Sequence, residues 1–568
     1  MADDDPIRLR EEVARIGILD AGGRAGGGAV MRMIRVLLAA CALAAAQAPE
    51  EHLRQGREHV REERWEEARA AYTAGARAAP GDIRFPLHLA GIAFKLGDHR
   101  TARGHLHAAL RIDEGNAYAN DFLATLYALD ENLDAALKYW NRVERPVAAS
   151  LRLPPGLRIR PTLLDGLFAF PPMGLIRRDD YLLTRARLEQ VGVFPRYRFQ
   201  VTPQAEGEKF EVEFAATEQA GWGPAGVARY VLPLRGIFFQ SVMPEYRNLG
   251  GRAVNLSSLA RWDRNKRRFG FVLSGPAGDD GSIRQAVYVD HRRERWDLRR
   301  SHRSGDAAPA DLDLRQLAAG YGFRGIVSHR HAWWVEMEAS WRSWPGGVPE
   351  GAEFAGGFAP IVRIGLDSRL LDVPERRFAV ETGMSVVTGK VMRSGLGAFV
   401  QTQGRMEGRW YPRARGEDGA MRMLVRGGRT AGGLPFDQLH VLGIERDTGL
   451  WMRGHAGTVD GRKGSAPMGR DSVLATWEVD KVVHRGGFWT LTVGPLLDAG
   501  RVWDGRGGFG GPGWLMDAGV QGRVRLLSGP EVTLSWGRDL RGGGSVFYAA
   551  LGRGPMLGRP FSGGQFLD

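Results

Sequence analysis

An arginine and a carboxylate in the C-terminal part of the chain, Arg453 and Asp498, have the residue types to form an ion pair. Asp498 lies in a segment with the alternation of a β-strand, in which successive side chains point to opposite faces. One face is apolar and the other is more polar (Trp489, Leu491, Val493 and Leu497 opposite Thr490, Thr492, Leu496 and Asp498). In the wall of a membrane barrel, the more polar face lines the lumen. We therefore predict that Asp498 points into a lumen, where a cation meets it.

Other patterns that would indicate catalysis or metal binding are absent or incomplete. The sequence contains no HExxH, Walker or GxSxG motif and no pair of cysteines. The glycine-rich run 505–513 is followed by no predicted helix and therefore reads as a loop, not a phosphate site. His329 and His331 are predicted to share a strand face, but a zinc site needs a third protein ligand that is not apparent. We predict no enzyme activity, no cofactor and no metal site.

Arginine-rich stretches and a net charge of +13 raise the question of an anionic partner. A basic chain suits an anionic lipid surface as well as nucleic acid. The stretches 264–268 and 292–300 lack the interleaved aromatic side chains on which bases stack. We predict contact with outer-membrane lipid and lipopolysaccharide, and no nucleic-acid partner.

Residues 221–555 are predicted to form a transmembrane antiparallel β-barrel of about 16 strands. No run of about 18 apolar residues indicates a spanning helix. Strands alternate instead (in 399–410, Val400, Thr402, Met406 and Trp410 lie opposite Gln401, Gln403, Arg405, Glu407 and Arg409), and 333–344 alternates in the same way. A soluble sandwich would need an apolar inner face, whereas a membrane barrel has a polar lumen.

The ends of the predicted strands supply two further expectations. Several tryptophans near strand ends are predicted to form an interfacial girdle (Trp262, Trp296, Trp344, Trp410 and Trp503). The closing strand is expected at 546–551 or, alternatively, at 561–566. The first choice leaves residues 556–568 as a C-terminal tail.

The N-terminal residues have the pattern of an export signal. Residues 1–30 are predicted to be an upstream extension, with translation starting at Met31 or Met33. Residues 31–46 combine basic residues, an apolar run and a small-residue cleavage site. Ordinary cleavage at the end of this segment is favoured over lipoprotein cleavage at Cys41. Either way, no cysteine pair is available for a disulfide, because Cys41 is the single cysteine.

Residues 49–147 contain a repeat with a period of 34 residues. Small residues recur at that step in two rows (Gly56, Ala90 and Ala124; Ala68, Ala102 and Ala136). This is the tetratricopeptide period, in which small residues allow two helices to cross closely. We predict an all-α solenoid of three such repeats. It either presents a groove that binds a client or envelope protein, or serves as a spacer.

Residues 151–220 are predicted to form a small α+β module. A helix is expected over 178–191, followed by strands at 197–201 and 209–214. This order resembles a single POTRA module, a domain that receives client chains by pairing at a sheet edge. The alternative is a linker domain without a client.

Two short motifs carry a resemblance to a known superfamily. Met452-Arg453-Gly454-His455 resembles a loop motif in which Arg-Gly stands between an aliphatic and an aromatic residue. Leu496 to Gly500 resembles the motif Phe-x-Asp/Asn-x-Gly of a following strand. Both belong to the bacterial surface antigen superfamily, which includes BamA, TamA and the two-partner-secretion transporters. His455 and Leu496 depart from the aromatic residues of these motifs.

The resemblance implies a structure and a function. It implies that the loop folds into the lumen, that Arg453 meets Asp498, and that Gly454 and Gly500 belong to the same structural site. It further implies an outer-membrane protein, with its N-terminal domains in the periplasm, that assists insertion or translocation of other proteins. A passive pore or an adhesin is the first alternative. A soluble periplasmic scaffold with a β-rich enzyme domain is the second.

Overall fold

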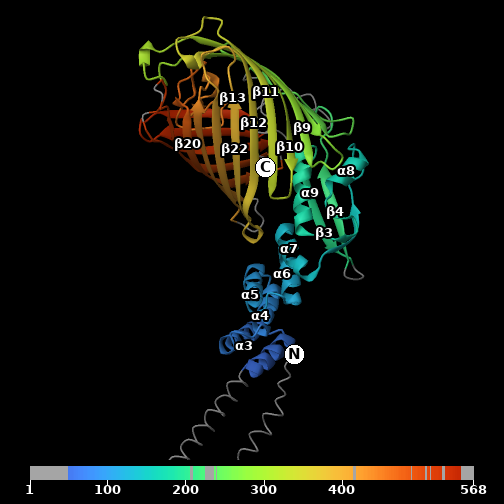
Figure 1. Cartoon of the computed structure of the whole chain (residues 1–568). Coiled ribbons are helices and arrows are strands. Elements are labelled where there is room, and N and C mark those ends of the chain that lie inside the picture. Colours follow the sequence, from blue (N-terminus) through green and yellow to red (C-terminus); the bar gives the residue numbers. More distant parts are fainter. Residues whose placement is uncertain are drawn as a thin grey trace, which may run out of the picture. The chain divides into compact units, whose positions relative to one another are not determined.

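The computed structural model describes residues 49–204, 209–223, 236–237, 240–412, 418–487, 489–505, 508–511, 513–526 and 531–551 (Figure 1). The predicted extension, the export signal and the C-terminal tail lie outside these residues. The chain divides into two compact units, residues 1–123 and 124–568.

The first unit is helical. Its described part contains a helix over residues 49–61 and then α3 (Trp65–Ala78), α4 (Arg84–Lys95), α5 (His99–Ile112) and the start of α6 (Ala117–Leu129). The small residues of the 34-residue repeat are buried where helices cross (Gly56, Ala68, Ala90 and Ala102). A Cβ atom at Gly56 would lie 2.3 Å from the Tyr72 ring, so this crossing has no room for a larger side chain.

The second unit begins with the end of α6 and with α7 (Leu133–Trp140), where Ala124 and Ala136 are also fully buried. Helix α7 contacts a turn of the barrel, η6 (Pro374–Arg376). The Asn132 side chain donates to the Pro374 carbonyl at 2.8 Å, and Tyr139 Oη donates to Glu375 at the same distance. These contacts fix α7 against one rim of the barrel.

A small four-stranded module follows α7. Its elements are β1 (Val147–Arg152), α8 (Pro161–Leu167), β2 (Gly174–Leu175), α9 (Arg178–Val191), β3 (Arg196–Pro203) and β4 (Lys209–Thr217). The sheet order is β2-β1-β4-β3, with β1 parallel to β4. The predicted helix and the two predicted strands are present at α9, β3 and β4. Phenylalanines from α8–β2, β3 and β4 build the core (Phe168, Phe170, Phe199 and Phe214).

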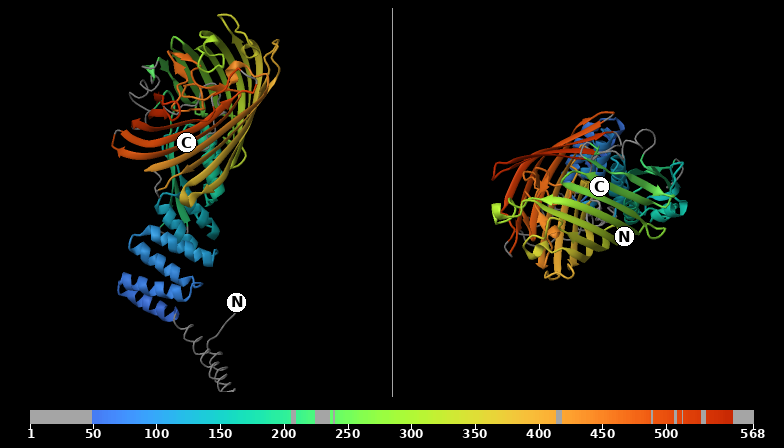
Figure 2. Two further views of the ribbon diagram at one scale, coloured as in Figure 1. Left: turned by 90° about the vertical axis from the view of Figure 1, so that its left-hand side faces the viewer. Right: turned by 90° about the horizontal axis from the view of Figure 1, so that it is seen from above.

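The remaining chain forms one large antiparallel sheet that curls into a barrel (Figures 1 and 2). Its wall strands are β5 (Ser241–Val242), β6 (Glu245–Leu249), β7 (Val254–Trp262), β8 (Lys266–Pro276), β9 (Ile283–Trp296), β10 (Leu312–Ile326), β11 (His331–Ser343), β12 (Gly357–Val373), β13 (Phe378–Gly389), β14 (Phe399–Trp410), β15 (Gly419–Gly432), β20 (Asp471–Arg485), β21 (Trp489–Trp503), β22 (Leu515–Leu526), β23 (Glu531–Asp539) and β24 (Ser545–Leu551). Short 3-10 turns η4 (Gly305–Ala307) and η5 (Ala352–Phe354) interrupt two loops.

The barrel sheet joins eighteen labelled strands, two of which, β17 and β18, belong to an inner segment. The other sixteen form the wall, although β5 and β6 pair in succession with the same strand, β7. Paired registers run unbroken from β6 to β15, then from β15 to β20 and on to β24. Among the described residues, no register joins β24 to β5, β6 or β7. The strand order places β24 beside β5. This junction, which no ladder among the described residues closes, is called the seam.

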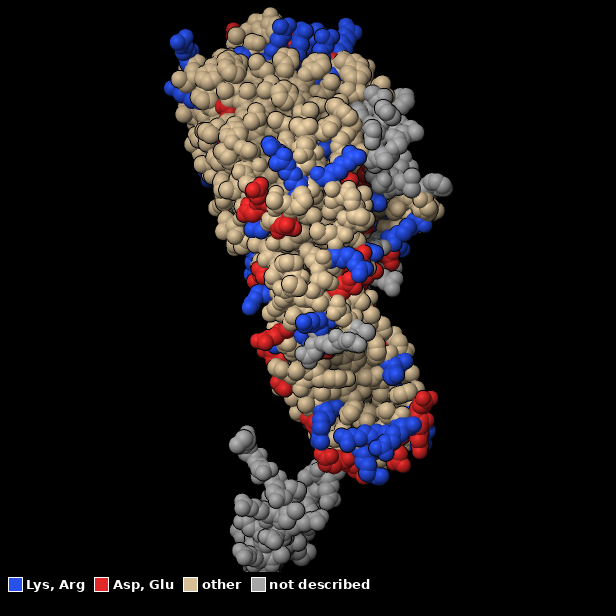
Figure 3. All heavy atoms as spheres, turned by 90° about the vertical axis from the view of Figure 1, so that its right-hand side faces the viewer, with Lys and Arg blue, Asp and Glu red and all other residues tan. Residues whose placement is uncertain are grey.

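Side chains alternate across the wall as predicted. In β11, Met337 is 52% exposed and Trp341 is 46% exposed, whereas Glu336 is fully buried. In β21, Leu497 faces outward and Asp498 inward. The outer face is therefore largely apolar, and Figure 3 shows few charged residues over the broad face of the barrel.

The tryptophans divide into two groups, and the prediction for two of them is wrong. Trp262, Trp410 and Trp503 are exposed near strand ends, as expected. Trp296 and Trp344 are buried instead, because they pack inside the barrel with an aromatic cluster that includes Phe354, Phe436 and Phe509. None of the described helices has the length and apolar character needed to cross a membrane.

Candidate functional site in the barrel lumen

The segment between β15 and β20, residues 433–470, lies inside the barrel and is called the lumen segment. It contains η7 (Phe436–Gln438), β16 (His440–Val441), β17 (Thr458–Val459), β18 (Arg462–Lys463) and β19 (Met468–Gly469). Strand β16 pairs with β19 and β17 with β18, so the segment has its own hydrogen-bonded structure. Its buried apolar residues pack on the wall, as Leu442 and Met452 do against Leu474, Val502 and Leu515.

Arg453 binds the inner face of β20 and β21. Its Nε donates to Asp498 Oδ2 at 2.8 Å, its backbone N–H donates to the same oxygen at 3.1 Å, and a second guanidinium nitrogen reaches the other oxygen. Glu478 on β20 accepts from Nη1. Burial opposes the charge, but the bonds and attraction from both carboxylates outweigh it and raise the pKa of Arg453. The structure therefore brings the two predicted residues together in a bidentate pair.

The glycines beside this pair permit a close approach of two backbones. A Cβ atom at Gly454 would lie 2.5 Å from the Asp539 backbone nitrogen. A Cβ atom at Gly537, on β23, would lie 2.4 Å from the Arg453 carbonyl oxygen. Gly500 is less restricted, since its Cβ would meet Leu442 Cδ2 at 3.0 Å. The loop backbone therefore rests directly on the wall, and a side chain at Gly454 has no space.

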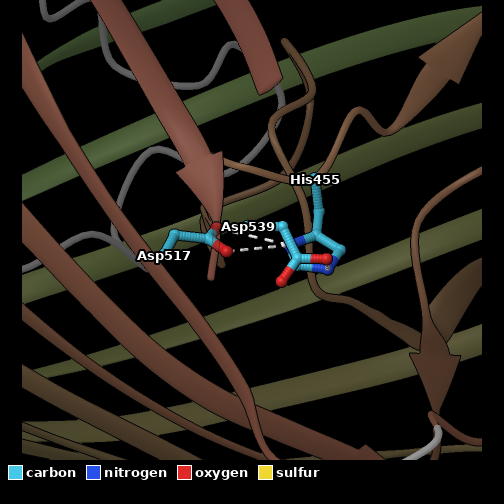
Figure 4. A group of neighbouring side chains, drawn as sticks. All are labelled: His455, Asp517 and Asp539. Atoms are coloured by element: carbon cyan, nitrogen blue, oxygen red, sulfur yellow. Dashed lines mark hydrogen bonds and ion pairs between the residues drawn. The ribbon is translucent and has the colours of Figure 1, made fainter. Parts of the chain in front are cut away.

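His455 binds two further wall strands (Figure 4). Its Nδ1 lies 3.1 Å from Asp517 on β22, and its Nε2 lies 3.5 Å from Asp539 at the end of β23. Asp517 also accepts the Gly454 backbone N–H. Burial lowers the pKa of His455, but the hydrogen bond and charge of Asp517 and the charge of Asp539 outweigh it and raise the pKa. An imidazolium ion between two carboxylates explains why histidine suits this position.

The same three side chains could also gather around a metal ion. Their ligand atoms lie within 4.8 Å of one another. However, the imidazole presents different ring nitrogens to Asp517 and Asp539, and one ion binds only one of those nitrogens. The arrangement of His455 therefore favours a double ion pair over a metal site.

Asp447, in the same lumen segment, binds the other end of the sheet. Its carboxylate lies 2.8 Å from Arg261 on β7 and 2.7 Å from Arg268 on β8. Lys463, also in the lumen segment, lies 3.2 Å from Asp447 and pairs with Glu294 on β9. Burial opposes ionisation, but the three cations hold the pKa of Asp447 well below its usual range. This second cluster ties the lumen segment to β7, β8 and β9.

Together the two clusters place the lumen segment across the seam. The Arg453 cluster holds β20 to β23, on the C-terminal side of the seam. The Asp447 cluster holds β7 to β9, on the N-terminal side. Between them, Trp451 contacts the Tyr548 ring of β24, with ring centroids 5.6 Å apart. The segment therefore connects both flanks of the seam from inside.

His329 and His331, the histidine pair considered in the sequence, do not contact the lumen segment in the hydrogen bonds and ion pairs described for them. His331 begins β11 and contacts Ser368, whereas His329 lies in the preceding turn, 3.7 Å from Asp179. The prediction that both share a strand face is therefore wrong. In contrast, sequence reasoning missed Asp447, Lys463 and Asp517. Of these three, only Asp517 could have been found from the sequence, because the alternation along β22 places it on the inward face.

Comparison with known proteins adds structural matches. No family model matches the sequence, and no curated protein does either. Among solved structures, CdiB from Escherichia coli matches with 10% identity and a TM-score of 0.48, over 72% of this chain and 76% of that chain. BamA from Haemophilus ducreyi, lacking POTRA domains 1–3, matches with 12% identity and a TM-score of 0.42, over 72% and 85%. The TPR2B domain of yeast Sti1 matches 17% of this chain, and 78% of its own, with 24% identity and a TM-score of 0.17.

BamA and CdiB each match 72% of this chain. The match to Sti1 is confined to a small part of it.

Proposed function

We propose that this chain is an outer-membrane barrel protein that assists insertion or translocation of other proteins, with its N-terminal domains in the periplasm. The apolar outer face of the wall strands suits the hydrocarbon core of a membrane. The inner face carries buried ion pairs, such as Arg363 with Glu336 at 2.9 Å. No step of the proposed function needs a cofactor or covalent catalysis.

One observation carries this proposal: the lumen segment binds strands on both flanks of a seam that no described ladder closes. Edge strands with unpaired backbone groups are templates for pairing with another chain. A seam held by side chains of an inner segment exposes such edges at a lower cost than a complete ladder would. A client strand can therefore pair there as it enters the membrane.

The N-terminal domains supply a second part of the proposal. We infer that the helices with the 34-residue period are three tetratricopeptide repeats that bind a client or an envelope partner. We infer that the four-stranded module is a POTRA-like domain whose edge strand β3 pairs with extended client segments. The buried alanines of the helices and the free edge of β3 support these roles.

A passive pore is the second candidate, because the lumen is lined by charged side chains. The buried clusters around Arg453 and Asp447 argue against it, since they hold a segment of the chain inside the lumen. An open channel would require this segment to leave, and removal of one partner of a buried ion pair costs about 3–5 kcal/mol.

Reconstitution distinguishes the two candidates. The purified chain is placed in lipid vesicles, and insertion of a urea-unfolded barrel client is followed by protease protection. In parallel, conductance is recorded across planar bilayers. The proposal predicts faster client insertion and little steady conductance, whereas steady conductance without accelerated insertion would establish the pore.

A further inference from the structure

A cleft of about 950 Å³ lies between the four-stranded module and the first barrel strands. One side is formed by α9 and β3, including Tyr197 and Arg198. The other side is formed by inward-facing residues at the rim of the barrel, including Val272, Ser274 and Arg284. The cleft therefore leads from the module to the mouth of the lumen.

Arg284 is a cation in this cleft without a carboxylate partner among the described residues. Its guanidinium donates to Ser274 Oγ at 2.7 Å, and its Nε is shielded from solvent without a hydrogen bond. The charged groups that act on it are Arg247 and Arg324, both of which are cations. Arg284 is half-buried, and a charge partly removed from water in this way is normally paired, so an anion is missing here.

The rest of the cleft has the same sign of charge. Five arginines and two glutamates line it (Arg185, Arg196, Arg198, Arg247 and Arg284; Glu131 and Glu189). The charge of Glu189 is already engaged, because its carboxylate accepts from Tyr197 Oη at 3.0 Å. The cleft therefore complements an anionic ligand.

The unpaired edge of β3 indicates that the anion belongs to an extended peptide. In the described sheet β3 pairs only with β4, so its other edge faces away from the sheet. Seven consecutive residues of β3, from Arg196 to Thr202, line the cleft. An extended peptide paired along this edge would lie in the cleft and carry its side chains past Arg284.

We propose that this cleft binds an extended client segment through a carboxylate that pairs with Arg284, while the segment's backbone pairs with β3. The inference rests on the proposed function and specifies the client chemistry that the module selects. The carboxylate is an aspartate or glutamate side chain or a chain terminus. A carboxylate there would supply the missing anion.

Fluorescence anisotropy on the full chain in detergent tests this inference. The probe is a short labelled peptide of alternating valine and threonine with one central aspartate and an amidated C-terminus. Arg284→Gln should weaken its binding about tenfold, the size of one charge-assisted hydrogen bond. The matched variant Arg300→Gln, which removes an exposed loop arginine, should bind as the wild type does. An unamidated peptide with asparagine at the centre reports on a terminal carboxylate.

A charge exchange keeps the test independent of folding defects. The variant Arg284→Glu should no longer bind the aspartate peptide. It should instead bind a peptide that has lysine at the same position. If neither Arg284 variant changes binding, or if inorganic phosphate competes as well as the peptide does, the inference is overturned. Equal binding of the amidated aspartate peptide, the amidated asparagine peptide and the unamidated asparagine peptide would also overturn it.

Cross-linking separates failure of this inference from failure of the proposed function. Gln200→Cys on β3 is combined with a cysteine in the peptide, and the native Cys41 is replaced. Cross-linking that persists with the asparagine peptide would refute only the role of Arg284. Absence of cross-linking with every peptide would refute client binding by the module itself.

Discussion

Arg453 and Asp447 lie six positions apart in the lumen segment, yet they bind strands on opposite flanks of the barrel's seam. Arg453 pairs with Asp498 on β21, whereas Asp447 pairs with Arg261 on β7. A short stretch of chain therefore couples the last strands of the sheet to the first ones. Loss of either ion pair should weaken the same junction.

Gly454→Ala should force the loop around residue 454 away from strands β22 and β23. Its Cβ atom would lie 2.7 Å from Asp517 Cγ, and overpacking of this kind costs about 1–3 kcal/mol. We expect a lower midpoint of heat unfolding, followed by band shift on gels. Gly404→Ala is the control, because its Cβ would have no neighbour within 4 Å. Equal midpoints for the two variants would contradict the close packing.

Asp447→Asn should open the seam from its N-terminal side. The substitution leaves Arg261, Arg268 and Lys463 without their shared carboxylate, at a cost of about 3–5 kcal/mol. We expect faster proteolysis of the barrel in folded samples, with Asp306→Asn unchanged. Proteolysis at the wild-type rate would show that the Asp447 cluster does not hold the junction.

The contact of His455 with β22 and β23 should depend on pH. Because the folded pKa of His455 is raised, its stabilising contribution is complete below the unfolded pKa of about 6.5. The contribution is lost as pH rises through the folded pKa. The heat-unfolding midpoint should therefore fall as pH rises above about 6.5, and His455→Phe should reduce this fall. A variant with the same fall as the wild type would exclude His455 as its source.

The helical unit provides a matched pair of glycine substitutions. A Cβ atom at Gly75 would lie 2.0 Å from the Phe85 ring, whereas one at Gly91 would have no neighbour within 4 Å. Gly91→Ala should stabilise the unit by about 0.5–1 kcal/mol, because alanine favours the helix. Gly75→Ala should destabilise it, and thermal circular dichroism of the helical signal measures both. Stabilisation by both changes would contradict the tight crossing of α3 and α4.

Much of the fold could be predicted because its signals are local. Alternation along β14 and β21 identified the inward and outward faces, and a 34-residue step identified the helix crossings. The wrong prediction that Trp296 lies on the outer surface also concerns a local pattern. Trp296 shares its strand face with Asp290 and Glu294, which are buried, so alternation predicts an inward side chain.

The lumen site was predictable only in part. Arg453 and Asp498 were found through motifs, because each motif is a short contiguous pattern. The partners of Asp447 were not found, since Arg261 is 186 positions away. No periodicity links a loop carboxylate to cations on distant strands. Only the curling of the sheet around the lumen segment brings these groups together.

Isolation of outer membranes, followed by gel migration with and without heating, shows whether the chain is a folded membrane barrel. Wild-type chain and Arg453→Ala are compared side by side. The account predicts that the wild type fractionates with outer membranes and migrates as a folded barrel until heated, and that the variant loses this shift at a lower temperature. A wild-type chain that is soluble and shows no shift on heating would contradict the barrel, and with it the role of the lumen segment.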